Sequence, residues 1–218
     1  MGKDKYIINR EEFKKNVLNE RIEKFGKDSL MDEEILHCLT GVKIEVAKEA
    51  IENYGLQEVL KYLNNYELTR TQAKKFKLLF EFVRRISNAP FKAKTALDSS
   101  SKAGQYVKNE LQFLGTEVFI AIFLDSQNRI ISKEVLSEGT INEAVVYPRE
   151  IVKLALINNA MGVILGHNHP AGSSVPSSSD IQSTKAVSSA LNTINVKVID
   201  HIVSYESEYI SFAEKGLL

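Results

Sequence analysis

The chain of 218 residues has little cysteine and no long apolar run. Cys38 is its only cysteine, which excludes an internal disulfide and a thiolate-rich zinc site. Any bound metal must therefore use histidine and carboxylate ligands. No stretch approaches the roughly 18 apolar residues of a membrane helix, and the N-terminal "MGKDKYIINREEFKKN" lacks the apolar core of a secretory signal. We therefore expect a soluble, cytoplasmic protein that does not associate with membranes.

Residues 1–90 differ in pattern from the rest of the chain. Apolar residues recur at three- and four-residue spacing in segments such as "EEILHCLTGVKIEVAKEAIENYG", which predicts short helices packed as a small all-helical domain. The segment "NAPFKAKTALDSSSKAG" interrupts this periodicity with Pro90, Gly104 and a run of serines, so we place a linker at residues 91–100.

Strand and helix patterns alternate in the second predicted domain, residues 101–218. The predicted strands are residues 118–124, 129–136, 161–166 and 196–204, and the predicted helices are residues 101–115, 147–160 and 181–194. Such alternation predicts a layered α/β domain.

A histidine-rich segment, "GHNHPAGSSVPSSSD" at residues 166–180, follows the third predicted strand. Because side chains alternate along a strand, His167 and His169 point to one side and Asn168 to the other. Asp180 lies in the first turn of the next predicted helix, where its carboxylate can approach the histidines. Three protein ligands with a fourth position left for water are typical of catalytic zinc, one ion per chain. The same ligand types also suit Fe(II) or Mn(II).

Helix capping is an alternative explanation for part of this segment. Ser177 can cap the helix, and Asp180, three residues later, can accept a hydrogen bond from its amide and face the positive end of the helix dipole. Capping does not explain two histidines at alternate positions, and Pro170 and Gly172 would shape the loop between them and the helix. A metal site and a capped polar loop are therefore both open interpretations.

Other enzyme classes fit these residues less well. A Ser/His/Asp hydrolase using Ser173–Ser179, His169 and Asp180 would lack the G-x-S-x-G turn that exposes such a serine. A nucleobase deaminase requires H-x-E followed by P-C-x-x-C, and this chain has Asn168 at the glutamate position and a single cysteine. No glycine-rich phosphate-binding motif is present.

The spacing from His167 to Asp180 resembles the JAMM motif, in which H-x-H is followed by seven residues, a serine, two residues and an aspartate. The surrounding "FLDSQNRIISKEVLSEG", "YPREIVKLALINNAMGVILGHNHP" and "VIDHIVS" resemble the RadC family from about residue 101 to the C-terminus. The resemblance implies a three-layer JAB/MPN fold, related to that of cytidine deaminases, with a mixed sheet. It also implies a preceding small all-α domain with helix-hairpin-helix elements.

The resemblance also implies roles for individual residues. His167, His169 and Asp180 would bind the metal, and Ser177 would donate a hydrogen bond to a developing oxyanion. The family's general base precedes the first strand, which corresponds to Glu117 in "GTEVFIAIFL". A solvated residue at the start of a strand is the alternative explanation for Glu117.

Three further residues receive secondary interpretations. Glu134 is a second candidate for the general base. His201, in the family-like "VIDHIVS", is expected to be a packed histidine or one that supports a metal ligand. His37, on an apolar helical face, is expected at the edge of a core.

The N-terminal half offers a second kind of candidate site. "LTGVKIEVAKEAI" resembles one helix-hairpin-helix element, whereas "LTRTQAKKFKLL" lacks the hairpin glycines of a second. Arg70, Lys74 and Lys77 share one helical face, with Arg84 nearby. This face predicts either contact with a nucleic-acid backbone or an ordinary solvated surface.

Three functions follow as hypotheses. The first is a zinc-dependent hydrolase that cleaves a peptide or isopeptide bond. The second is a DNA-processing protein, in keeping with the family's DNA-repair label, whose metal site cuts phosphodiesters or only stabilises the fold. The third is a binding module whose helical half docks DNA or a protein partner.

Overall fold

A computed structural model describes residues 10–62, 65–91, 95–139, 147–170 and 175–218. Its chain divides into two compact units, Met1–Phe80 and Glu81–Leu218. Gly172, to which the sequence assigned a part in shaping the loop, lies outside the described residues. Within the described ranges, no helix is both long enough and apolar enough to cross a membrane.

The first unit is helical. Its elements are α1 (Arg10–Phe25), η1 (Lys27–Ser29), α2 (Asp32–Thr40), α3 (Ile44–Tyr62) and the N-terminal part of α4 (Arg70–Ser87). Gly41 ends α2 in the left-handed conformation at φ 78°, which a glycine adopts without steric cost. Gly55 interrupts α3 with a different non-helical conformation, φ 74° and ψ 159°, whose positive φ also favours glycine. Buried side chains form the core: Leu36, Val42, Ala47, Ala50, Val59 and Phe76.

The second unit is built on a five-stranded sheet in the order β2-β1-β3-β4-β5. The strands are β1 (Glu117–Leu124), β2 (Ile130–Gly139), β3 (Gly162–His169), β4 (Lys197–Tyr205) and β5 (Glu208–Ser211). Only β3 and β4 pair in parallel, so the sheet is mixed. The helices are α5 (Ser100–Leu111), α6 (Pro148–Ile157), α7 (Ser178–Asn192) and the short α8 (Phe212–Lys215).

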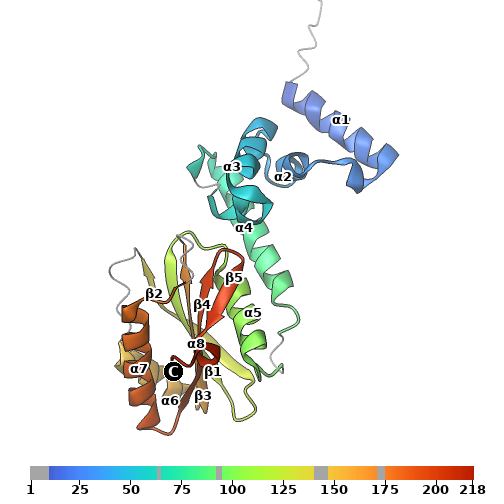
Figure 1. The fold of residues 1–218 in the computed structure, drawn as a ribbon. Coiled ribbons are helices and arrows are strands. Elements are labelled where there is room, and N and C mark those ends of the chain that lie inside the picture. Colours follow the sequence, from blue (N-terminus) through green and yellow to red (C-terminus); the bar gives the residue numbers. More distant parts are fainter. Residues whose placement is uncertain (1–9, 63–64, 92–94, 140–146, 171–174) are drawn as a thin grey trace, which may run out of the picture. The chain divides into compact units, whose positions relative to one another are not determined.

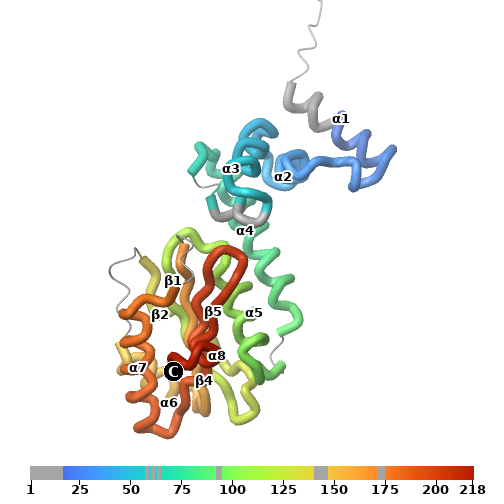
Figure 2. Tube along the Cα trace, in the orientation of Figure 1, coloured from blue at the N-terminus to red at the C-terminus, as the bar shows by residue number. Residues whose placement is uncertain are grey.

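Helices cover both faces of this sheet. α5 packs on one face, and α6 and α7 pack on the other (Figures 1 and 2). β1 alternates between the two layers: Ile120 and Ile122 face α5, whereas Phe119, Ala121 and Phe123 face α6 and α7. The predicted α/β class with a mixed sheet, preceded by a helical region, is therefore confirmed.

The third strand is longer than its apolar run predicts. The pattern ends the strand at Gly166, but β3 continues to His169 because β4 pairs with it as far as His169 and Tyr205. The polar residues at this end are held in strand geometry by neighbouring strands. β5 and α8 were not expected from the sequence.

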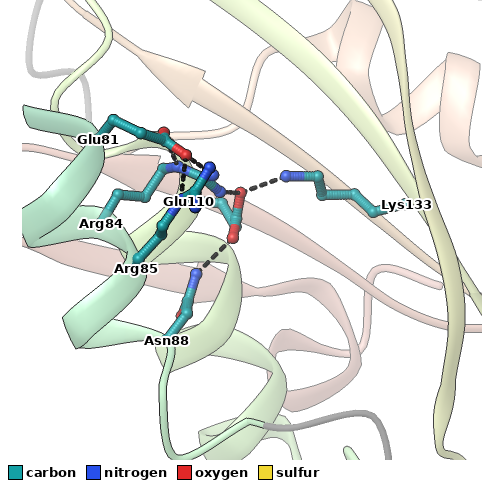
Figure 3. Close-up of polar contacts among 6 residues, drawn as sticks. All are labelled: Glu81, Arg84, Arg85, Asn88, Glu110 and Lys133. Atoms are coloured by element: carbon teal, nitrogen blue, oxygen red, sulfur yellow. Dashed lines mark hydrogen bonds and ion pairs between the residues drawn. The ribbon is translucent and has the colours of Figure 1, made fainter. Parts of the chain in front are cut away.

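A buried carboxylate holds three structural elements of the second unit together (Figure 3). Glu110 of α5 is 7% exposed and accepts hydrogen bonds from Arg84 and Asn88 and from Lys133 of β2. Arg84 also donates to Glu81, with Nη2 and Oε1 2.9 Å apart. Glu110 thus joins the C-terminal end of α4, α5 and the edge strand.

Replacing Glu110 with alanine is expected to destabilise the second unit by about 2–4 kcal/mol, because the cations of Arg84 and Lys133 lose their buried partner. Urea denaturation would measure this as a lower midpoint. The exposed Glu138 of β2 provides the control, and Glu138→Ala should stay within about 0.5 kcal/mol of the wild type. Equal midpoints for the two variants would show that the cluster adds no stability.

Candidate metal centre

The central strand β3 positions two of the candidate ligands. Its residues are buried on both sides as far as Asn168, and His167 is only 1% exposed. His167 and His169 lie on the same face, with their Nε2 atoms 3.0 Å apart. The ring of Phe119, opposite His167 in the antiparallel register, stacks on His167 with a centroid distance of 5.6 Å. These contacts fix the direction in which the imidazoles point.

A capping box at the start of α7 positions the third candidate ligand. The Asp180 amide donates to Ser177 Oγ at 3.1 Å, and the Ser177 amide donates to Asp180 Oδ2 at 2.7 Å. Asp180 Oδ1 lies 3.5 Å from His167 Nε2, and Oδ2 lies 3.6 Å from His169 Nε2. The two interpretations of this segment are therefore compatible, because the cap aims the carboxylate at the histidines.

The three side chains suit a metal ion in chemistry and spacing. Within the described residues, one ligand atom each of His167, His169 and Asp180 lie within 4.8 Å of one another. Ligands placed tetrahedrally at ~2.1 Å from a zinc ion lie ~3.4 Å apart, close to the 3.0–3.6 Å separations between these atoms. Two imidazole nitrogens and one carboxylate oxygen are a donor set that zinc accepts while leaving a coordination position open. These residues could therefore hold a metal ion.

The charges around the centre also favour a cation. Burial raises the pKa of Asp180, but the neighbouring imidazoles of His167 and His169 and the hydrogen bond with Ser177 outweigh burial and leave this pKa well below its usual range. Asp180 is thus a carboxylate at any ordinary pH. Behind the ligands, burial lowers the pKa of the fully buried His201 well below its usual range, so its imidazole is neutral.

Glu117 lies on the face of the sheet that carries the ligands. β1 and β3 pair with Phe119 opposite His167, and side-chain alternation along β1 places Glu117, two residues before Phe119, on the same face. Glu134, the second candidate base, pairs instead with Ala121, whose other neighbour is Leu165. Glu134 is therefore one strand further from β3 and closer to the other end of it. Of the two carboxylates, Glu117 is the better placed to act at the centre.

The Asn168 side chain points away from the histidines, as the sequence predicted, and it also makes hydrogen bonds that the sequence did not suggest. Its Oδ1 accepts a hydrogen bond from the Val118 amide at 2.8 Å, and its Nδ2 donates to the carbonyls of Thr116 and Leu114 at 2.9 and 3.2 Å. The residue between the two histidines therefore holds the segment that carries Glu117. Its side-chain direction followed from strand alternation, but its partners lie about 50 residues earlier in the chain.

The remaining predicted site residues lie elsewhere or have other partners. Arg70, Lys74 and Lys77 are exposed on the first turns of α4. Arg84, which the sequence placed near this face, forms ion pairs with Glu81 and Glu110. The sequence missed Glu110 as a partner because 26 residues separate it from Arg84. His37 is half-buried, with Nδ1 2.6 Å from the Val42 carbonyl oxygen.

Fold and candidate centre together define a JAB-type α/β domain with a His/His/Asp group at the end of its central strand. The family model of the RadC-like JAB domain matches residues 97–217. The chain is 35% identical over 211 residues to a UPF0758 protein of Cellvibrio japonicus, covering 91% of this chain and 94% of the relative. A UPF0758 protein of Pseudomonas syringae pv. tomato is 34% identical with the same coverage. The chain belongs to the RadC family, as its resemblance implied.

Proposed function

We propose that the JAB domain is a zinc-dependent hydrolase of the JAMM type that cleaves peptide or isopeptide bonds. The observation that carries this proposal is the convergence of His167, His169 and Asp180 on the sheet face that bears Glu117. JAB domains include hydrolases, which supports a catalytic use of this group.

Each residue of the centre has a separate task in this proposal. His167, His169 and Asp180 would hold the zinc ion, which when bound supplies Lewis acidity that lowers the pKa of water and polarises a carbonyl group. Glu117 accepts a proton from the attacking water and delivers it to the leaving amine. Ser177 Oγ accepts from the Asp180 amide, which leaves its hydroxyl proton to donate to the oxygen that becomes negatively charged.

Metal analysis combined with hydrolysis assays tests the proposal directly. Protein purified without chelator should contain about one zinc ion per chain and should hydrolyse labelled peptides or isopeptide-linked peptides. The same preparation is assayed on labelled single- and double-stranded DNA. Cleavage of DNA alone would support the DNA-processing alternative, and protein without bound metal would refute both catalytic functions.

A second candidate function is nucleic-acid binding by the helical unit. The exposed side chains of Arg70, Lys74 and Lys77 occupy positions i, i+4 and i+7 of α4, so three cations project from one helical face. Such a face can contact successive phosphates without reading the base sequence.

Neutralising Arg70, Lys74 and Lys77 to glutamine should weaken binding to double-stranded DNA. Each phosphate contact contributes about 0.9 to the slope of log K against log salt, so the slope should become shallower by about 2–3. Fluorescence anisotropy across a salt series measures both effects. Three exposed lysines elsewhere in the same unit, Lys24, Lys27 and Lys48, provide a triple control. Equal slopes of log K against log salt in the two triple variants would show that this face of α4 is an ordinary solvated surface that does not bind DNA.

A further inference from the structure

A chain of buried hydrogen bonds runs from the start of α7 to the metal-facing histidine. Thr184 Oγ1 lies 2.6 Å from the Asp180 carbonyl oxygen and 2.6 Å from His201 Nδ1. His201 Nε2 in turn lies 2.8 Å from His167 Nδ1. Thr184, His201 and His167 are each at most 1% exposed, so water does not compete for these contacts.

The backbone carbonyl of Asp180 determines which atom donates in each of these hydrogen bonds. A carbonyl oxygen can only accept, so the single hydroxyl proton of Thr184 is donated to Asp180. The contact between Thr184 and His201 then requires the proton on His201 Nδ1. With its proton on Nδ1, the fully buried His201 ring presents the lone pair of Nε2, which accepts from Nδ1–H of His167.

Surrounding groups keep the His201 ring in this orientation. Phe212 and Phe119 lie against it, with ring centroids 4.5 and 5.3 Å away. Asp200 precedes His201 in the sequence, but its carboxylate accepts from the His201 and Ala213 amides and the Ser211 hydroxyl. The ring nitrogens of His201 therefore contact Thr184 and His167, while the Asp200 carboxylate is engaged by backbone amides and a hydroxyl.

We propose that Thr184 and His201 are positioning residues that hold His167 in the Nδ1–H tautomer, so that the lone pair of Nε2 faces the ion. This inference rests on the metal site of the proposed function. Without these hydrogen bonds, the ring proton of His167 could occupy Nε2, the nitrogen that must be unprotonated to bind a metal. One ligand, Asp180, would thus set the tautomer of another through its backbone carbonyl.

The tautomer can be read in the metal-free protein by long-range ¹H–¹⁵N correlation NMR of the histidine rings. We expect His167 and His201 each to carry the proton on Nδ1 in the wild type. The ring signals that disappear in His201→Gln are assigned to His201. A proton on Nε2 of His167 in the wild type would overturn the proposal, whether or not the protein binds zinc.

A pair of variants at Thr184 separates the hydroxyl from the shape of the side chain. Thr184→Val keeps the shape and removes the hydroxyl, so zinc affinity should fall about 10- to 100-fold and the His167 tautomer should become mixed. Thr184→Ser keeps the hydroxyl and should retain affinity within about 3-fold. Affinity is measured by competition with a chromophoric chelator, with circular dichroism as the test of folding.

Thr193, the residue that follows the last residue of α7, offers a matched control. Its hydroxyl also bonds a helix carbonyl, Ala190 O at 2.6 Å, but it is exposed and lies at the far end of α7. Thr193→Val should bind zinc as the wild type does. Wild-type zinc affinity in Thr184→Val would overturn the proposal. If the wild-type protein bound no zinc, the proposed function would be refuted, but the NMR measurement would still show whether the protons of the Thr184–His201–His167 hydrogen bonds point as proposed.

Discussion

Replacing Glu117 with glutamine is expected to abolish hydrolysis while the bound zinc remains. Glutamine keeps the size and hydrogen-bonding reach of the side chain but cannot take a proton from water at neutral pH. General-base catalysis contributes about 10²- to 10⁴-fold, so kcat should fall by that factor. Initial rates on the labelled peptide measure this loss, and elemental analysis of the same sample measures the metal.

The matched control is the same substitution at Glu134. Glu134 lies on the same face of the sheet but one strand further from the histidines. Glu134→Gln should therefore keep near wild-type turnover and metal content. If Glu134→Gln were inactive and Glu117→Gln active, the assignment of the base would be reversed. If both variants turned over at the wild-type rate, neither carboxylate would be the base.

Replacing Asp180 should remove the zinc ion, and two substitutions separate this effect from helix capping. Asp180→Ala removes both the metal ligand and the capping acceptor, so it should lose zinc and about 0.5–2 kcal/mol of stability. Asp180→Asn keeps an oxygen that can accept from the Ser177 amide, so it should lose most zinc affinity with little change in stability. His167→Ala should lose zinc without affecting the cap.

Thermal unfolding with and without added zinc measures both effects. A ligand that binds only the folded state raises the melting temperature, so zinc should stabilise the wild type after chelator treatment. It should not stabilise Asp180→Asn or His167→Ala. Retention of zinc-dependent stabilisation in both variants would contradict the proposed ligand set.

Local features of the sequence were enough to predict the candidate ligands. The alternation of His167 and His169 depends only on strand geometry, and the pairing of Ser177 with Asp180 depends only on their spacing at a helix start. Apolar periodicity likewise predicted the central strands and the flanking helices within a few residues. These features can be read from sequence because the interactions that cause them span at most four residues.

Long-range pairing decided the rest. The preference for Glu117 over Glu134 depends on the register of β1 with β3, which no local pattern encodes. The chain from Thr184 through His201 to His167 requires α7 and β4 to pack beside β3. The ion pair between Arg84 and Glu110, which are 26 residues apart in the sequence, likewise forms only when α5 packs against the C-terminal end of α4.

The amino-acid sequence by itself thus determined which residues carry the ligand chemistry and which elements present them, because strand alternation and helix capping are local. The tertiary structure alone decided how those ligands are supported. The partner of a buried or partly buried polar side chain is whichever group the packing brings within hydrogen-bond distance, and His167, Asn168 and Arg84 each have a partner 26 or more residues away in the sequence.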